Sequence, residues 1–177
     1  MGIKSWIKSA SLLLNELAEI DFGYPLGENI IRSPKNKDIV QLSLSNVGYS
    51  NDKTLYDFYL TCDGLSWPDV NNGYFINSIE KFNGKELLQK MVPVKITGAY
   101  ADSIMVFGSD GGGGLFAIRK SQNDILYLPT GPVKNGVFDG NAGKVQKIGD
   151  NFSEFLKRLL DDLRAFVLDE EGYIYIS

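Results

Sequence analysis

The chain has 177 residues, of which 44% are apolar and 23% charged, and its formal net charge is −4. These values are ordinary for a globular protein, so a single domain over residues 1–177 is expected. Histidine is absent and Cys62 is the single cysteine, which excludes Ser-His-Asp and Cys-His catalysis, histidine-ligated zinc and an intrachain disulfide.

The first predicted element is an amphipathic helix. Its apolar stripe consists of Ile3, Ile7, Ala10, Leu14 and Leu17, with Trp6 beside it as a core residue. Gly23 and Pro25 predict that the helix ends near Ile20. The apolar run is too short to span a membrane, so we expect neither a signal peptide nor a membrane anchor, and a cytoplasmic location.

The next region carries mixed signals. The stretch DIVQLSLSNV alternates apolar and polar residues, which favours a strand or an extended arm. Residues 1–50 are therefore expected to form a helix plus an extended N-terminal arm. A second helix follows, capped by Asp52 or Thr54 and closed by Gly64, with a buried, structural Cys62 on its apolar face.

From Gly73 onward, short β-type runs alternate with turn residues. The runs are GYFINSI, VPVKITGAY, SIMVFGS, GLFAIRK, DILYLPTG and NGVFDG, and a short helix is predicted at FNGKELLQKM. Strands joined by short turns favour antiparallel pairing. The expected fold class is α+β, with a mainly antiparallel sheet of about five to six strands packed by N-terminal, middle and C-terminal helices.

The C-terminal region contains the clearest helix, capped by Asn151 or Ser153, and GYIYIS is expected to add a final strand. Residues 149–177 hold the acidic excess, which argues against a nucleic-acid ligand and suits a basic protein partner. Asp161 and Asp162 are adjacent on this helix and diverge by about 100°, so they cannot share a proton. Solvated surface charge is expected for this pair and for the cluster Asp169, Glu170 and Glu171.

The stretch VFGSDGGGGLFAI places four consecutive glycines between two apolar runs. It lacks the Lys and Ser/Thr of a P-loop, and a strand follows where a dinucleotide-binding fold would begin a helix. A phosphate nest built from backbone N–H groups stays open as an alternative. A hairpin or bulged turn is the favoured interpretation, in which Asp110 either bonds its own backbone or is exposed. The turn consists of Gly108, Ser109, Asp110, Gly111, Gly112, Gly113 and Gly114.

This stretch resembles the strand–Gly-Ser-Asp-Gly-Gly–strand signature of the SUKH superfamily, the Smi/Knr-type domain. LYDFYLTCDGLSWPDV and FSEFLKRLLDDL resemble helices of the same family, and the resemblance covers about residues 50–168. The chain departs from the family pattern at Lys53-Thr54 before the middle helix, at Asp63-Gly64 after it, and in a long 24–50 stretch. These departures leave the subfamily open.

The resemblance implies a non-enzymatic protein-binding domain. Since histidine is absent and cysteine occurs once, we also expect neither a metal nor a cofactor. Bacterial members are often immunity proteins that neutralise toxin domains, so we expect a monomer or weak dimer that binds a cognate, basic toxin. Fungal members take part in regulating cell-wall synthesis, which gives a regulatory or scaffold module as an alternative. A binder of a small phosphate-containing ligand at the glycine turn is a second alternative.

Exposed tryptophan, tyrosine and charged residues in loops are the natural candidates for contacts with a partner. Trp67 either presents its ring to a partner or folds inward as a lid on the core. The acidic residues of the last helix and its end could form a charged rim that governs association rate. The candidate contacts are Trp67, Asp69, Tyr100, Asp102, Asp110, Asp161 and Asp162.

Overall fold

The computed structural model describes residues 2–49, 52–82 and 92–176. Four α-helices occur in these ranges: α1 (Ile3–Ala18), α2 (Lys37–Val47), α3 (Lys53–Thr61) and α4 (Phe152–Val167). Two short 3-10 helices, η1 (Ile79–Phe82) and η3 (Gly98–Tyr100), lie among the strands. Asp52 caps α3 and Asn151 caps α4, each accepting a backbone N–H through its side chain, so the first of the two candidates at each helix is the cap.

The described strands form one ten-stranded sheet around the long strand β5. The strands are β1 (Ile30–Ile31), β2 (Leu65–Trp67), β3 (Tyr74–Ile76), β4 (Lys95–Ile96), β5 (Asp102–Asp110), β6 (Leu115–Arg119), β7 (Ile125–Leu128), β8 (Val133–Lys134), β9 (Val137–Phe138) and β10 (Gln146–Gly149). On one side β5 pairs with both β3 and β4, and on the other with β6, which continues to β7 and β10. These pairs are antiparallel, and β4 and β9 pair in parallel.

The α+β class and the mainly antiparallel sheet are therefore confirmed, while the number of strands exceeds the expected five to six. Several strands have only two or three residues. A strand that short is invisible to a search for alternating apolar residues, because alternation needs at least four positions to show.

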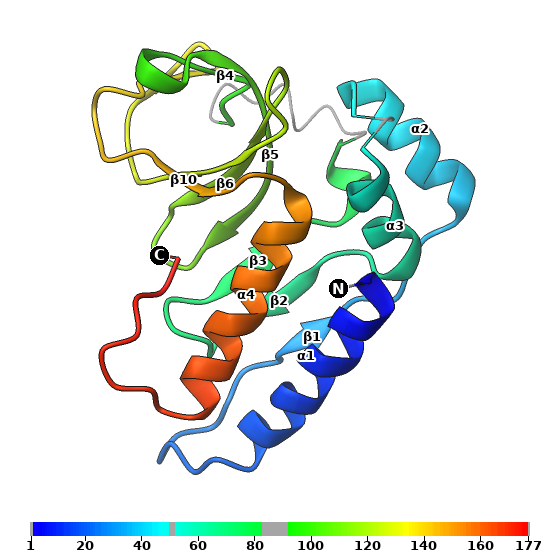
Figure 1. The fold of residues 1–177 in the computed structure, drawn as a ribbon, viewed down its shortest axis with the longest axis vertical. Coiled ribbons are helices and arrows are strands. Elements are labelled where there is room, and N and C mark those ends of the chain that lie inside the picture. The colour runs from blue at the N-terminus through cyan, green and yellow to red at the C-terminus, as the bar shows by residue number, and fades with distance from the viewer. Residues whose placement is uncertain (1, 50–51, 83–91, 177) are drawn as a thin grey trace.

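Figure 1 shows α1 and α4 packed in front of the part of the sheet that holds β1, β2 and β3, with α3 beside them and α2 farther out. The upper part of the sheet, from β4 to β10, curls around a second and smaller apolar cluster. Strand β5 runs through both parts and joins them.

Two tryptophans tie the helical layer to the sheet. The rings of Trp6 on α1 and Trp67 on β2 stack with centroids 5.9 Å apart and planes inclined by 16°. The Trp6 indole N–H donates to the carbonyl oxygen of Leu156 on α4 at 2.5 Å. Trp6 is thus a core residue, as predicted, and one side chain connects α1, α4 and the sheet.

The predicted strand or extended arm at DIVQLSLSNV is wrong, because this stretch is helix α2. Val40 and Leu44 are buried at helical spacing, whereas Leu42, which an alternating strand would bury with them, is 59% exposed. The deciding signals lie at the ends of the stretch. Asn36 caps the helix by accepting the Asp38 N–H, and Gly48 closes it in the left-handed conformation.

The predicted final strand at GYIYIS is also wrong. Residues 173–176 belong to no strand, and the Ile176 N–H donates to the carboxylate of Asp162 rather than to a neighbouring strand. The helix predicted at FNGKELLQKM falls almost entirely outside the described residues.

The four-glycine stretch is a tight turn between β5 and β6, as predicted. The Asp110 side chain folds over this turn. One carboxylate oxygen accepts the Gly114 N–H at 2.7 Å, and the other accepts the Tyr127 hydroxyl at 2.8 Å. Gly111 donates to the Gly73 carbonyl at 3.2 Å, so β3 lies directly against the turn. A Cβ on Gly111 would sit 2.0 Å from the Asn72 carbonyl oxygen, so no larger residue fits there without moving the backbone.

The two neighbours Gly111 and Gly112 make a matched pair for testing this constraint. A Cβ on Gly112 would meet only the Asp110 carboxylate, at 3.5 Å or more, which is ordinary contact. Gly111→Ala should therefore lower the free energy of unfolding by about 1–3 kcal/mol, and Gly112→Ala by less than about 0.5 kcal/mol. Urea unfolding of both variants measures the difference, and equal effects would contradict close packing as the reason for the glycines.

Candidate partner-binding surface

Acidic side chains from the two ends of the chain meet at one end of the molecule. The helix α1 and the loop that follows supply one group, and the turn after α4 supplies the other; both lie at the bottom of Figure 1. The rings of Phe22 and Phe166 stack with centroids 6.1 Å apart and hold the two segments together. We call this surface the acidic end; its exposed carboxylates are Glu16, Glu19, Asp21, Asp169, Glu170 and Glu171.

Apolar side chains are exposed within the acidic end. Tyr24 and Leu168 are each 59% exposed, and Tyr24 packs against Phe22 with ring centroids 5.8 Å apart. Asp161 lies nearly two helical turns before the end of α4, is half-exposed, and pairs with Arg164 at 3.1 Å. An exposed aromatic and an exposed aliphatic side chain on segments that also carry exposed carboxylates suit contact with a protein that offers apolar and basic groups.

Sequence reasoning predicted only half of this surface. Asp169, Glu170 and Glu171 were expected as surface charge, but Glu16, Glu19, Asp21 and Tyr24 were not selected. The end of an amphipathic helix is commonly polar, so the sequence gives no signal that this helix end faces the acidic turn. The contact between Phe22 and Phe166 brings them together.

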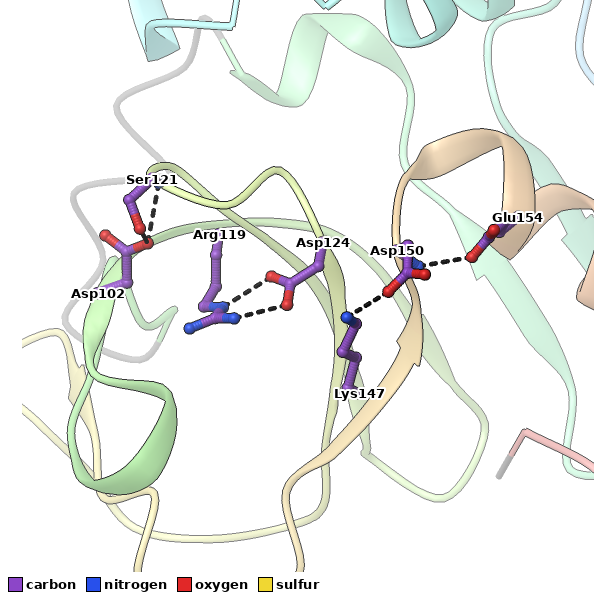
Figure 2. A network of polar contacts seen from close by, with 7 residues as sticks. All are labelled: Asp102, Arg119, Ser121, Asp124, Lys147, Asp150 and Glu154. Carbon is purple, nitrogen blue, oxygen red and sulfur yellow. Dashed lines mark hydrogen bonds and ion pairs between the residues drawn. The ribbon is translucent and has the colours of Figure 1, made fainter.

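A second polar surface lies at the other end of the sheet and includes Tyr100 and Asp102, which the sequence predicted as candidates. Figure 2 shows Arg119 facing Asp124, with Asp102 and Ser121 on one side. Arg119 donates to Asp124 from Nε at 2.7 Å and from Nη2 at 2.6 Å, and its guanidinium lies 5.3 Å from the centre of the Tyr100 ring. The structure therefore brings Tyr100 and Asp102 together around an arginine.

The groups of this second surface are already engaged with one another. One Asp102 oxygen accepts both the hydroxyl and the N–H of Ser121, at 2.6 and 2.9 Å. These bonds lower the pKa of Asp102 against the opposing effect of burial. Beyond Asp124, Figure 2 shows Lys147 paired with Asp150, whose N–H donates to Glu154 at 2.8 Å. The sequence did not single out Arg119 or Asp124, because each ends or precedes a strand without any distinguishing pattern.

An apolar groove of about 320 Å³ opens beside β5. It lies where β5 passes from pairing with β4 to pairing with β3. The Tyr49 hydroxyl at its edge donates to the Ile118 carbonyl at 2.9 Å, so it is engaged within the fold. The described residues that line the groove are Val47, Tyr49, Pro93, Val94, Ser103, Ile104, Met105, Val106 and Lys120.

Three of the predicted contact residues are buried or hydrogen-bonded within the protein itself. Trp67 has no exposed surface, so the prediction that it presents its ring to a partner is wrong, and its inward alternative holds. Its indole N–H has no acceptor in the described part of the chain. Asp69 accepts from the Gly27 N–H at 2.8 Å and from the Asn29 amide at 2.6 Å, which fastens the segment before β1. Asp110, at 5% exposure, is consumed by its own turn.

Asp162 is the largest departure from expectation. It is fully buried, so the prediction of solvated charge and of a partner contact at this residue is wrong. Its carboxylate accepts three hydrogen bonds: from the Tyr74 hydroxyl at 2.5 Å, the Tyr173 hydroxyl at 2.9 Å and the Ile176 N–H at 3.0 Å. The divergence of about 100° between adjacent helical side chains turns Asp161 outward and Asp162 inward.

The described residues offer few groups with the chemistry of a reactive site. Burial raises the pKa of the Cys62 thiol to about 12, so it is a poor nucleophile. In residues 2–49, 52–82 and 92–176, no three His, Cys, Asp or Glu side chains gather closely enough to hold a metal ion. No helix in these ranges combines the length and apolar character needed to cross a bilayer.

The buried carboxyl group of Asp162 should make the stability of the fold depend on pH. Burial raises the pKa of Asp162, while hydrogen bonds from Tyr74, Ile176 and Tyr173 act in the opposite direction. Because the folded state binds this proton more tightly than the unfolded chain, the carboxyl stabilises the fold at pH below its unfolded value of about 3.9. This contribution is lost as the pH rises through the folded pKa.

Asp162→Asn removes the titration, so its stability relative to the wild type should grow as the pH is raised from about 3.5 to 7.5. Urea unfolding across this range measures the trend. Asp161→Asn, which removes the adjacent half-exposed carboxylate, is the matched control. A relative stability of Asp162→Asn that instead falls with rising pH would mean that the hydrogen bonds outweigh desolvation.

Comparison with known proteins identifies the family of this fold. The family model that matches is that of the SMI1/KNR4 family (SUKH-1), over residues 40–158. No curated protein matches the chain. The matched span begins in α2, contains the glycine turn and every strand from β2 to β10, and ends within α4. Since the match covers more than half of the chain, the protein belongs to the SMI1/KNR4 family (SUKH-1).

Proposed function

We propose that this protein acts by binding rather than by catalysis, as an immunity protein that captures and neutralises a cognate toxin domain. Membership of the SMI1/KNR4 family (SUKH-1) supports a protein-binding role of this kind. The single observation that carries the proposal is the acidic end, where two distant segments that carry exposed carboxylates also carry exposed Tyr24 and Leu168.

The partner that this surface fits is a basic protein, such as a toxin that acts on nucleic acid. Six exposed carboxylates gather at the acidic end, and Arg164, the nearby arginine of α4, pairs with Asp161. Such a field accelerates encounter with a basic surface and is screened by salt. Tyr24 and Leu168 would then supply the apolar contact that slows dissociation. We place this encounter in the cytoplasm, between one copy of each protein.

The second polar surface is a weaker candidate for the same role. Arginine and tyrosine, the residue types of Arg119 and Tyr100, often contribute most of the binding energy at interfaces. Arg119, however, already donates two short hydrogen bonds to Asp124. A partner would have to compete with a well-formed ion pair whose carboxylate side chain is only 4% exposed. The acidic end requires no such exchange.

The proposal is tested by capturing the partner and then reversing charge at two matched places. Affinity capture of the tagged chain from its own cells should recover one stoichiometric partner with a basic domain. The test variant is Glu19→Lys with Glu170→Lys, both at the acidic end. The control is Asp38→Lys with Asp139→Lys, which changes the net charge equally at exposed positions elsewhere.

At low salt, the test variant should associate with the purified partner about tenfold more slowly than the wild type. The difference should shrink near 0.5 M salt, because the Debye screening length is about threefold shorter there than at low salt. The control should stay within about twofold. Stopped-flow mixing measures both rates. Equal losses in the two variants, or an acidic partner, would contradict binding at the acidic end, and recovery of wall-synthesis enzymes would favour the regulatory alternative.

A further inference from the structure

We infer that residues 173–176 form a latch, which closes on the buried carboxylate of Asp162 and opens as a unit while the rest of the fold stays intact. The inference concerns the protein alone and does not depend on the identity of any partner.

Two of the three hydrogen bonds that Asp162 accepts come from this segment. The Tyr173 hydroxyl reaches one carboxylate oxygen at 2.9 Å, and the Ile176 N–H reaches the other at 3.0 Å. The third donor, Tyr74, lies on β3 and approaches at 2.5 Å. Asp162 on α4 therefore stands between the sheet and the C-terminal segment and is bound by both.

A single apolar side chain accompanies these bonds. Ile176 is 3% exposed and joins the main hydrophobic core, whereas Ile174 is 82% exposed. Tyr173 and Tyr175 are half-buried and pack edge-to-face, with ring centroids 5.0 Å apart. The segment thus has two anchor points, the Asp162 carboxylate and the socket of Ile176.

The backbone of the segment is otherwise weakly attached. Residues 173–176 belong to no strand or helix, and the Tyr173 N–H makes a long 3.3 Å bond to the Glu170 carbonyl within the preceding turn. Asp169 and Gly172, which border that turn, have φ values of 50° and 75°. Such a segment, joined to a helix through a short exposed turn and held by few buried contacts, belongs to the part of a protein that opens locally.

Opening would expose a carboxylate that the closed state desolvates. Water would replace the Tyr173 and Ile176 donors, so the free energy required is much smaller than that of unfolding α4, whose apolar face lies in the core. Only Gly172 separates the latch from Glu171, so the closed state of the latch restricts where the acidic turn after α4 lies.

Amide hydrogen exchange tests the latch on the full chain. In the wild type, the Ile176 amide should exchange at least about 100-fold faster than the Leu163 amide in the middle of α4, because it becomes free without global unfolding. Tyr173→Phe removes one bond to Asp162 from a half-buried ring. It should speed exchange at Ile176 by about three- to tenfold and leave Leu163 unchanged.

Tyr74→Phe is the matched control, because it removes the same kind of bond to the same carboxylate from the sheet side. It should not increase the ratio of the Ile176 rate to the Leu163 rate. The inference is overturned if Ile176 and Leu163 exchange at the same rate in the wild type. It is equally overturned if Tyr173→Phe and Tyr74→Phe change both amides alike, since the segment would then unfold only with the whole domain.

Discussion

The structure depends on two backbone segments lying closer together than any side chain would allow. A Cβ on Gly108 would sit 2.4 Å from the Phe75 carbonyl oxygen, and one on Gly111 would sit 2.0 Å from that of Asn72. Because β3 can therefore lie against the end of β5, β2 and β1 add outward from it and carry Trp67 beneath α1. The same placement directs Tyr74 toward Asp162. The glycines thus position the helical layer and the buried carboxylate, and their role is geometric packing.

The parts of the fold that the sequence predicted are those specified within a few residues. The glycine turn at Asp110, the caps at Asp52 and Asn151, each one of two candidates, and Trp6 beside a helical apolar stripe all follow from local spacing. Helix α2 was missed because DIVQLSLSNV fits both a two-residue and a helical period. The residues that decide between them, Asn36 and Gly48, lie just outside the stretch. A strand was wrongly predicted at GYIYIS because tyrosine and isoleucine alternate there, but no neighbouring strand pairs with residues 173–176.

The candidate site shows the same limit more strongly. Asp161 and Asp162 were both expected to be solvated, although adjacent helical side chains diverge. The Tyr74 hydroxyl that binds the buried Asp162 belongs to a residue 88 positions away, so nothing near Asp162 in the sequence indicates its burial. The acidic end likewise joins residues from both ends of the chain, through the packing of α1 against α4 and the contact between Phe22 and Phe166. Charge can be counted along a sequence, whereas the surface on which it gathers is decided by packing between distant segments.

The stacking of Trp6 on Trp67 also determines which structural change the tryptophan spectra of this protein detect. These are the two tryptophans of the chain, and both are buried within one core, with their rings 5.9 Å apart. Their fluorescence and near-ultraviolet circular dichroism therefore arise from a single coupled pair between α1 and the sheet. A spectral change reports the separation of these layers. A protein that binds at the acidic end would leave the tryptophan signal unchanged unless it carries a chromophore of its own.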